Sequence, residues 1–169
     1  MNKQPKVAVI MGSDSDFPAL KGCISFLKKM DIAAEVFVMS AHRTPDKAAE
    51  FAASADKNGF DCLIAAAGKA AHLAGVLAAH TVIPVIGVPI KASTLDGLDA
   101  LLSTVQMPKG IPVATVAIDG GDNAAILAAQ ILAIKYDYLK QKLYDMKKDM
   151  AEAVEDKNLK IKKLAEEII

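Results

Sequence analysis

A histidine and the chain's single arginine stand side by side in the segment 40–44, Ser-Ala-His-Arg-Thr. Imidazole gives and takes protons near neutral pH, which makes His42 the natural general acid and base of this chain. All other basic residues are lysines, so the planar guanidinium of Arg43 is a specific choice that suits a phosphate or a carboxylate. The pair predicts proton transfer beside a bound anion. The alternatives are a structural histidine and a surface arginine.

A second candidate segment is 12–16, Gly-Ser-Asp-Ser-Asp, at the predicted start of a helix. Free backbone N–H groups and the helix dipole favour an anion at such a position. Ser13 is therefore a candidate phosphate ligand. Asp16 would repel a phosphate, but it could accept hydrogen bonds from ribose hydroxyls, cap the following helix, or do both. The segment is neither a Walker loop nor a dinucleotide-binding G-x-G-x-x-G motif.

The segment 65–75 is nearly free of large side chains. Small residues at the end of a strand allow the backbone to approach a ligand closely, although close helix–sheet packing is the alternative. His72 is the second candidate polar group, whereas His80 falls late in a predicted helix and is expected to be structural. The histidines are widely spaced with no carboxylate in register, so no metal site is predicted. A G-x-S-x-G turn is also missing, which argues against a hydrolase of that type.

These candidate segments follow apolar runs that alternate with segments of helical spacing. Continuous apolarity is typical of strands covered on both faces, and the alternation predicts a three-layer αβα sandwich around a parallel sheet. Ligands of such α/β folds bind beyond the carboxyl ends of the strands, in the loops 12–16, 40–44, 68–72 and 89–93. The predicted strands are 7–11, 35–39, 62–67, 84–88 and 112–118; the predicted helices are 17–29, 45–58, 70–80, 95–104 and 123–134.

Turn residues mark the ends of the first two predicted helices. Asp16 and Thr44 are expected to be N-caps, because a proline stands in the first turn of each following helix. Asn58-Gly59 is a suitable C-terminal stop for the second helix.

Beyond residue 134 the sequence predicts a long amphipathic helix. Apolar residues recur every three or four positions among many charges. Because the sheet is already complete, this helix is expected to pack on a neighbouring subunit; folding onto its own domain is the alternative. We predict a single catalytic domain over 1–169, with a core of about 6–134, a helical extension of about 135–169, and fraying over 157–169. The stripe consists of Leu139, Leu143, Met146, Met150 and Val154.

Composition restricts the possible partners and the compartment. Lys plus Arg and Asp plus Glu each total 20, so the balanced charge predicts no binding of nucleic acid or of an anionic membrane. No apolar run is long enough for a membrane helix, and residues 1–6 are too few and too polar before the first strand for a secretory signal. Cys23 and Cys62 lie in apolar stretches, as buried thiols of a reducing compartment do. We therefore expect a cytoplasmic protein.

Five strings, taken together and in order, resemble the family of N5-carboxyaminoimidazole ribonucleotide mutases, the class I catalytic subunits of phosphoribosylaminoimidazole carboxylase. The resemblance implies a flavodoxin-like fold, a homo-octamer and a reaction without a cofactor. In that reaction of de novo purine biosynthesis, a carboxyl group moves from the exocyclic nitrogen of the imidazole to ring carbon C4, with carbon dioxide as an intermediate. The strings are MGSDSD at 11–16, SAHRTP at 40–45, AAHL at 70–73, QMPKGIPV at 106–113 and NAAILAAQIL at 123–132.

The resemblance also assigns roles to individual residues. The family's proton-transfer histidine falls on His42, beside the matching Ser40. Its phosphate- and ribose-binding positions fall on Ser13, Asp16 and Arg43. The family's glycine-rich loop, which completes the substrate site, falls on Ala67, Gly68, Lys69, His72 and Leu73.

The glycine-rich loop departs from the family pattern at two places. The family commonly has two glycines before Ala-Ala-His, where this chain has Gly68-Lys69. It also has Leu73-Ala74-Gly75 in place of the usual Leu-Pro-Gly. Lys69 would either touch the migrating carboxylate or point to solvent.

Two other functions are alternatives to the mutase. An aminoimidazole ribonucleotide carboxylase that uses free carbon dioxide shares the fold, but that branch more often has S-A-H-K and lacks Ala-Ala-His, so 40–44 and 70–73 favour the mutase. A non-catalytic flavodoxin-like module that binds a nucleotide or flavin has little support. Aromatic residues make up only 5% of the chain, and no tryptophan is available to stack on a flavin.

Overall fold

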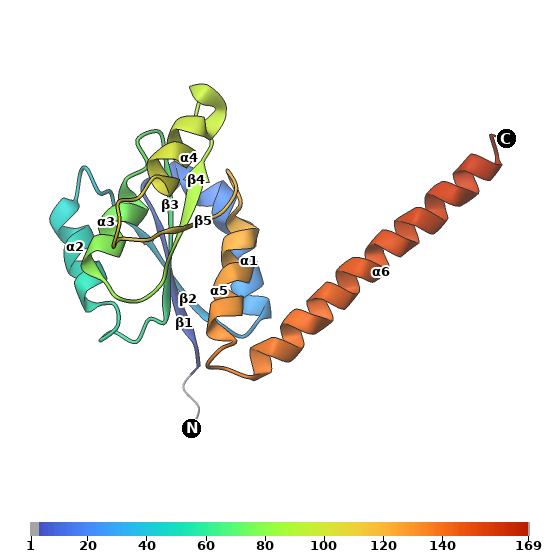
Figure 1. Ribbon diagram of the computed structural model, residues 1–169, viewed down its shortest axis with the longest axis horizontal. Helices are drawn as coiled ribbons and strands as arrows, with labels where there is room; N and C mark the ends of the chain where they lie inside the picture. Colours follow the sequence, from blue (N-terminus) through green and yellow to red (C-terminus); the bar gives the residue numbers. More distant parts are fainter. Residues whose placement is uncertain (1–3, 169) are drawn as a thin grey trace.

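A five-stranded parallel sheet forms the centre of the protein, seen here in a computed structural model that describes residues 4–168 (Figure 1). The predictions for 1–6 and 157–169 therefore lie partly outside the described residues. The strand order, β2-β1-β3-β4-β5, is the flavodoxin-like doubly wound order. The strands are β1 (Lys6–Met11), β2 (Ala33–Val38), β3 (Cys62–Gly68), β4 (Val85–Ile90) and β5 (Ala114–Thr115).

Helices cover both faces of this sheet, which confirms the predicted three-layer αβα sandwich. Alternate strand residues point to opposite faces, so Val9 packs with the helices on one side and Ile10 with those on the other. One layer contains α1 (Phe17–Lys29), α5 (Gly121–Leu132) and the start of α6 (Tyr138–Glu166). The other contains α2 (Pro45–Ser54), α3 (Leu73–His80) and α4 (Leu98–Val105), as Figure 1 shows.

The two edge strands depart from the sequence-based prediction. Val36 and Val38 of β2 are 42% and 52% exposed, so the prediction that both faces of this strand are covered is wrong. The reason is its place at the edge of the sheet, where only β1 flanks it. At the other edge, β5 pairs over two residues instead of 112–118. Pro112 has no N–H to contribute to the ladder.

Several helix ends also differ from the prediction. Neither Asp16 nor Thr44 caps the helix that follows it, because each side chain is bonded within its own turn. Helix α2 stops at Ser54, and the chain reverses at Gly59, whose φ is 80°. The predicted helix 70–80 begins only at Leu73. A short 3-10 turn, Leu95–Gly97, precedes α4 within the predicted helix 95–104.

The long helix α6 is rooted in the core and then leaves it. Leu139 and Leu143 are buried against the chain's own core, so for them the alternative, a helix folded onto its own domain, holds. Further out, Met150 and Val154 are 59% and 64% exposed, and α6 extends away from the sandwich (Figure 1). The helix continues to Glu166, so the expected fraying over 157–169 is wrong for its described part up to that residue.

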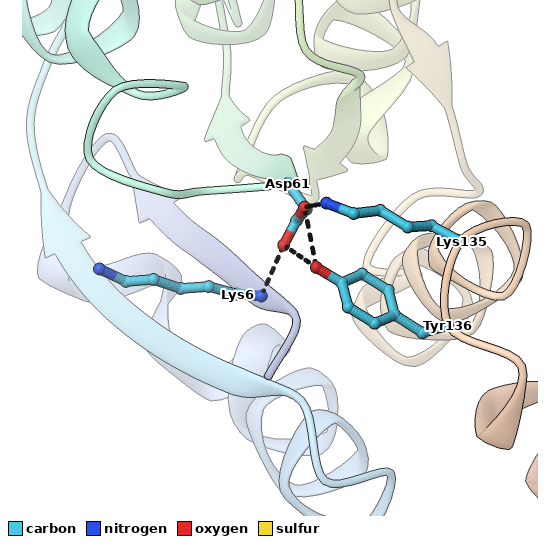
Figure 2. Close-up of polar contacts among 4 residues, drawn as sticks. All are labelled: Lys6, Asp61, Lys135 and Tyr136. Atoms are coloured by element: carbon cyan, nitrogen blue, oxygen red, sulfur yellow. Dashed lines mark hydrogen bonds and ion pairs between the residues drawn. The ribbon is translucent and has the colours of Figure 1, made fainter. Parts of the chain in front are cut away.

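A polar cluster ties the root of α6 to the amino end of the sheet, as Figure 2 shows. Asp61, just before β3, accepts a hydrogen bond from the backbone N–H of Lys6 at 3.1 Å. It also accepts hydrogen bonds from the Tyr136 hydroxyl at 3.2 Å and from the Lys135 ammonium at 3.0 Å. One carboxylate thereby joins β1, β3 and the connection between α5 and α6.

Candidate active site

A cleft of about 340 Å³ lies at the carboxyl ends of the strands, opposite the Asp61 cluster. Its walls are the loops that follow β1, β2, β3 and β4. This is the switch point of the sheet, where the chain order reverses between β1 and β3 and where α/β folds bind ligands. The structure brings all ten sequence-predicted site residues to this cleft: Ser13, Asp16, Ser40, His42, Arg43, Ala67, Gly68, Lys69, His72 and Leu73.

The cleft also contains residues of the predicted ligand-binding loops 12–16 and 89–93 that were not predicted individually as site residues. Ser15 lies between the two selected residues of the first loop, and Lys91 follows β4 with its neighbours Ile90 and Ala92. Their place in loops at the carboxyl ends of strands was the signal that pointed to them. The ammonium of Lys91 is paired with Asp96 at 2.9 Å.

Two histidines from distant parts of the sequence meet in the cleft. His42 Nε2 lies 2.9 Å from His72 Nδ1, and the two rings stand edge to face with an interplanar angle of 87°. One ring must donate and the other accept, so the tautomer of each depends on the other. Protonating both rings would remove the acceptor. The contact therefore needs at least one neutral ring.

The loop that carries His42 is held by its own hydroxyl groups. Ser40 Oγ accepts hydrogen bonds from the backbone N–H groups of His42 and Arg43, at 3.3 and 3.2 Å. Thr44 Oγ1 accepts from the Ser40 N–H at 2.9 Å and donates to the Ser40 carbonyl at 3.0 Å. These bonds fix the direction in which the two functional side chains leave the backbone.

Arg43 carries a free guanidinium on the wall of the cleft. Its side chain is exposed and forms no ion pair with any residue between 4 and 168. A guanidinium without a carboxylate partner keeps its two parallel N–H donors available for an anionic ligand. The arrangement therefore fits the anion clamp that the sequence predicts.

The first loop forms a capping box around Asp16. Its carboxylate accepts a hydrogen bond from the Ser13 N–H at 3.1 Å, while Ser13 Oγ accepts from the Ser15 N–H at 3.3 Å. Asp16 is buried, and this burial raises the pKa of its carboxyl above the ordinary value, although the hydrogen bonds from Ser13 and Ser15 oppose the shift. The N–H of Ser13 is thus already engaged by Asp16.

Replacing Asp16 with Asn is expected to change the pH dependence of stability. A raised pKa in the folded state means that the unfolded chain loses this proton first, so stability falls as pH rises through the titration. Asn keeps an acceptor for the Ser13 N–H but carries no buried charge. The wild type should therefore lose stability between about pH 4 and about pH 7 while D16N does not, so the free energy of unfolding of D16N minus that of the wild type should increase with pH. Urea unfolding at both pH values measures this, and a constant difference would contradict it.

The loop after β3 is shaped by close contacts. A Cβ on Gly68 would lie 3.2 Å from the carbonyl oxygen of Ile90, so a larger residue would press on β4. Lys69 has a φ of 56°, in the left-handed region that favours glycine. Ala71 and Ala74 are buried in packing, whereas Ala67 is half-buried and lines the cleft. The packing alternative therefore holds for Ala71 and Ala74, whereas close approach of the backbone to a ligand at Ala67 stays a prediction.

The third histidine and the two cysteines lie outside the cleft. His80 is exposed at the last residue of α3, outside the cleft. Cys23 and Cys62 are buried, and this burial raises the pKa of both thiols to about 12. Among residues 4–168, no three histidine, cysteine or carboxylate side chains gather as a metal site would require. Over the same range, no helix combines the length and apolarity needed to cross a membrane.

The sequence between residues 6 and 153 matches the AIR carboxylase family. The chain belongs to this family. Its N5-carboxyaminoimidazole ribonucleotide mutase relative from Pyrococcus horikoshii is 52% identical over 163 residues, which cover 96% of this chain and 92% of the relative. Membership of the AIR carboxylase family confirms the resemblance carried by the five sequence strings.

A second relative and a solved structure agree with this family membership. The phosphoribosylaminoimidazole carboxylase of Ogataea methanolica is 56% identical over 131 residues, covering 78% of this chain but 24% of that longer protein. The crystal structure of Treponema denticola PurE superposes with a TM-score of 0.82 at 26% identity, covering 93% of this chain and 98% of the other. The AIR carboxylase family therefore includes relatives named as mutase and as carboxylase.

Proposed function

We propose that the protein is an N5-carboxyaminoimidazole ribonucleotide mutase of de novo purine biosynthesis, on the route to IMP. It would move the carboxyl group from the exocyclic nitrogen to C4 and release 4-carboxy-5-aminoimidazole ribonucleotide. The observation that carries the proposal is the His42–His72 pair, at 2.9 Å, in one cleft with the free guanidinium of Arg43. Identity of about half with relatives named as this mutase, over nearly the whole chain, supports it.

The proton balance of this rearrangement needs one group that serves as acid and then as base. The bond between nitrogen and the carboxyl carbon breaks, carbon dioxide forms, and protonated His42 gives its proton to the nitrogen. Ring carbon C4 then attacks carbon dioxide, and neutral His42 removes the C4 proton to restore the aromatic ring. The histidine ends as it began, so no external proton donor is required. His72 would hold the His42 ring in place through the shared hydrogen bond.

The remaining cleft residues suit the rest of the substrate. Arg43 and the hydroxyl of Ser13 would bind the phosphate, and the Asp16 carboxylate would accept ribose hydroxyls. Ser40 would hold the loop beside the substrate, while Ala67, Gly68 and Leu73 would exclude water from the trapped carbon dioxide. The cleft volume, about 340 Å³, falls in the range of about 300 to 1,000 Å³ typical of small-molecule sites.

Replacing Arg43 with Lys should weaken substrate binding although the charge is retained. Lysine is a point charge and cannot form the two parallel N–H contacts of a guanidinium. We expect the Michaelis constant to rise about tenfold, which corresponds to the loss of roughly one charge-assisted hydrogen bond, with a smaller change in turnover. Steady-state kinetics measure both constants. If neither changed, the anion clamp would be assigned to the wrong residue.

The carboxyl donor decides between the mutase and its nearest alternative. The Ogataea relative is named a carboxylase, so an enzyme that joins free carbon dioxide to aminoimidazole ribonucleotide is the second candidate. The test supplies either the N5-carboxylated nucleotide or aminoimidazole ribonucleotide, each with and without ¹³C-labelled bicarbonate. The mutase requires fast turnover of the first substrate without added bicarbonate. Turnover only of the second, with label in the product, would establish the carboxylase.

We further propose a cytoplasmic homo-octamer built from single catalytic domains, each with a core of about 6–134 and a helical extension of about 135–169. The family resemblance supplies the number eight. The exposed outer half of α6 and the exposed β2 residues Val36 and Val38 support contacts between subunits, because burial of apolar surface stabilises association. The proposed reaction uses no cofactor and involves neither nucleic acid nor membrane.

A further inference from the structure

Lys69 occupies a backbone position that glycine would adopt without strain. Its φ is 56°, it follows directly after β3, and its side chain is exposed on the wall of the cleft. Nothing in the loop geometry calls for a side chain here, since the preceding residue, Gly68, provides the close approach to Ile90. A lysine held in a conformation unfavourable to it points to a use for its ammonium group.

The ammonium of Lys69 has no anionic partner within residues 4–168. The other lysine of the cleft, Lys91, is paired with Asp96. The two unpaired cations of the cleft are therefore Lys69 and Arg43. They follow β3 and β2, which are separated by β1, so the strand ends that carry them lie roughly 10 Å apart. The cleft thus offers a cation to each of two anionic groups on one ligand.

We propose that Lys69 binds the carboxylate that migrates, while Arg43 binds the phosphate at the other end of the substrate. This inference rests on the proposed function. The loop that carries Lys69 also carries His72, three residues later, whose ring contacts His42. The migrating carboxylate must lie beside the proton-transfer group, and Lys69 is the unpaired cation on that loop. Lys69 thereby makes the site selective for a carboxylated nucleotide over the same nucleotide without its carboxylate.

The proposal predicts a division between binding and turnover. The reactant and the product carry an anionic carboxylate, whereas the carbon dioxide intermediate is neutral. An ammonium group therefore stabilises the bound reactant and product without stabilising the step between them. Loss of Lys69 should therefore raise the Michaelis constant without lowering the turnover number, because the bound reactant is destabilised and the reacting step is not.

The test compares Lys69→Met, which keeps the length of the side chain, with Lys69→Gly, which also removes the strained φ. Lys28→Met is the matched control, because Lys28 is an exposed lysine near the far end of α1. Binding is measured for the product, 4-carboxy-5-aminoimidazole ribonucleotide, and for aminoimidazole ribonucleotide, together with kinetics on the N5-carboxylated substrate. Thermal unfolding checks that each variant is folded, and the Gly variant should be at least as stable as the wild type.

Both Lys69 variants should bind the carboxylated nucleotides about fivefold more weakly, as expected for one charge-assisted contact at an exposed site. Binding of aminoimidazole ribonucleotide should stay within about twofold, the turnover number should not fall, and Lys28→Met should match the wild type. Equal weakening for both nucleotides, or no weakening, would overturn the assignment. Failure of the proposed function is a separate outcome, namely a wild-type protein that turns over neither substrate, and it would remove this inference as well.

Discussion

Replacing His42 with Asn should abolish most turnover while leaving the fold and nucleotide binding nearly intact. Asn can keep a hydrogen bond toward His72, but it can neither give a proton to the exocyclic nitrogen nor remove one from C4. Loss of general acid–base catalysis typically lowers the rate by about 100- to 10,000-fold. The measurement is the turnover number on the N5-carboxylated nucleotide, together with the dissociation constant of the product.

His80→Asn is the matched control for this experiment, because His80 is exposed at the end of α3 and does not line the cleft. It should leave both constants unchanged. Activity of His42→Asn within about tenfold of the wild type would show that another group transfers the proton. A variant that lost binding as strongly as turnover would instead make His42 a binding residue.

Shortening α6 should have two different effects that depend on where the chain is cut. A chain that ends at Ile134 loses Leu139 and Leu143 from the core, along with the bond from Tyr136 to Asp61. Truncation of one buried leucine typically destabilises a protein by about 2–5 kcal/mol. Losing two therefore removes much of the roughly 5–15 kcal/mol that keeps a domain folded. The protein that ends at Ile134 should therefore unfold or precipitate.

A chain that ends at Met146 should stay folded but assemble into smaller particles. It keeps Leu139 and Leu143, so its thermal unfolding should remain cooperative. It loses the exposed outer half of α6, including Met150 and Val154, whose burial against a neighbouring subunit is proposed. Light scattering on the intact and shortened proteins measures the change. An intact protein that is monomeric at micromolar concentration, or a shortened one of unchanged assembly size, would contradict the proposed role of α6.

Much of the architecture could be predicted from local patterns. Continuous apolar runs identified β1, β3 and β4 because a strand buried on both faces cannot carry polar side chains on either. The periodicity of α1 predicted its bounds, 17–29, as the structure has them. Loop positions followed from the alternation of strands and helices, and this placed all ten predicted residues at one end of the sheet.

Other features depend on contacts between residues far apart in the sequence. The hydrogen bond between His42 and His72 exists because β1 lies between β2 and β3 and their loops lean together above it. The exposure of Val38 follows from the place of β2 at the sheet edge. No local pattern contains the strand order.

Asp16 and α6 show the same difference between what a local sequence pattern predicts and what the tertiary structure decides. The sequence indicated that Asp16 stands at a helix start, but the capping box around Ser13 decided which N–H groups its carboxylate accepts. The stripe from Leu139 to Val154 showed that α6 is amphipathic, yet it could not show where the helix leaves the core. That point depends on how far the chain's own sandwich extends beneath the helix, which is a property of the packed layers. Periodicity records which side of a helix is apolar, and only the tertiary structure supplies the surface that covers it.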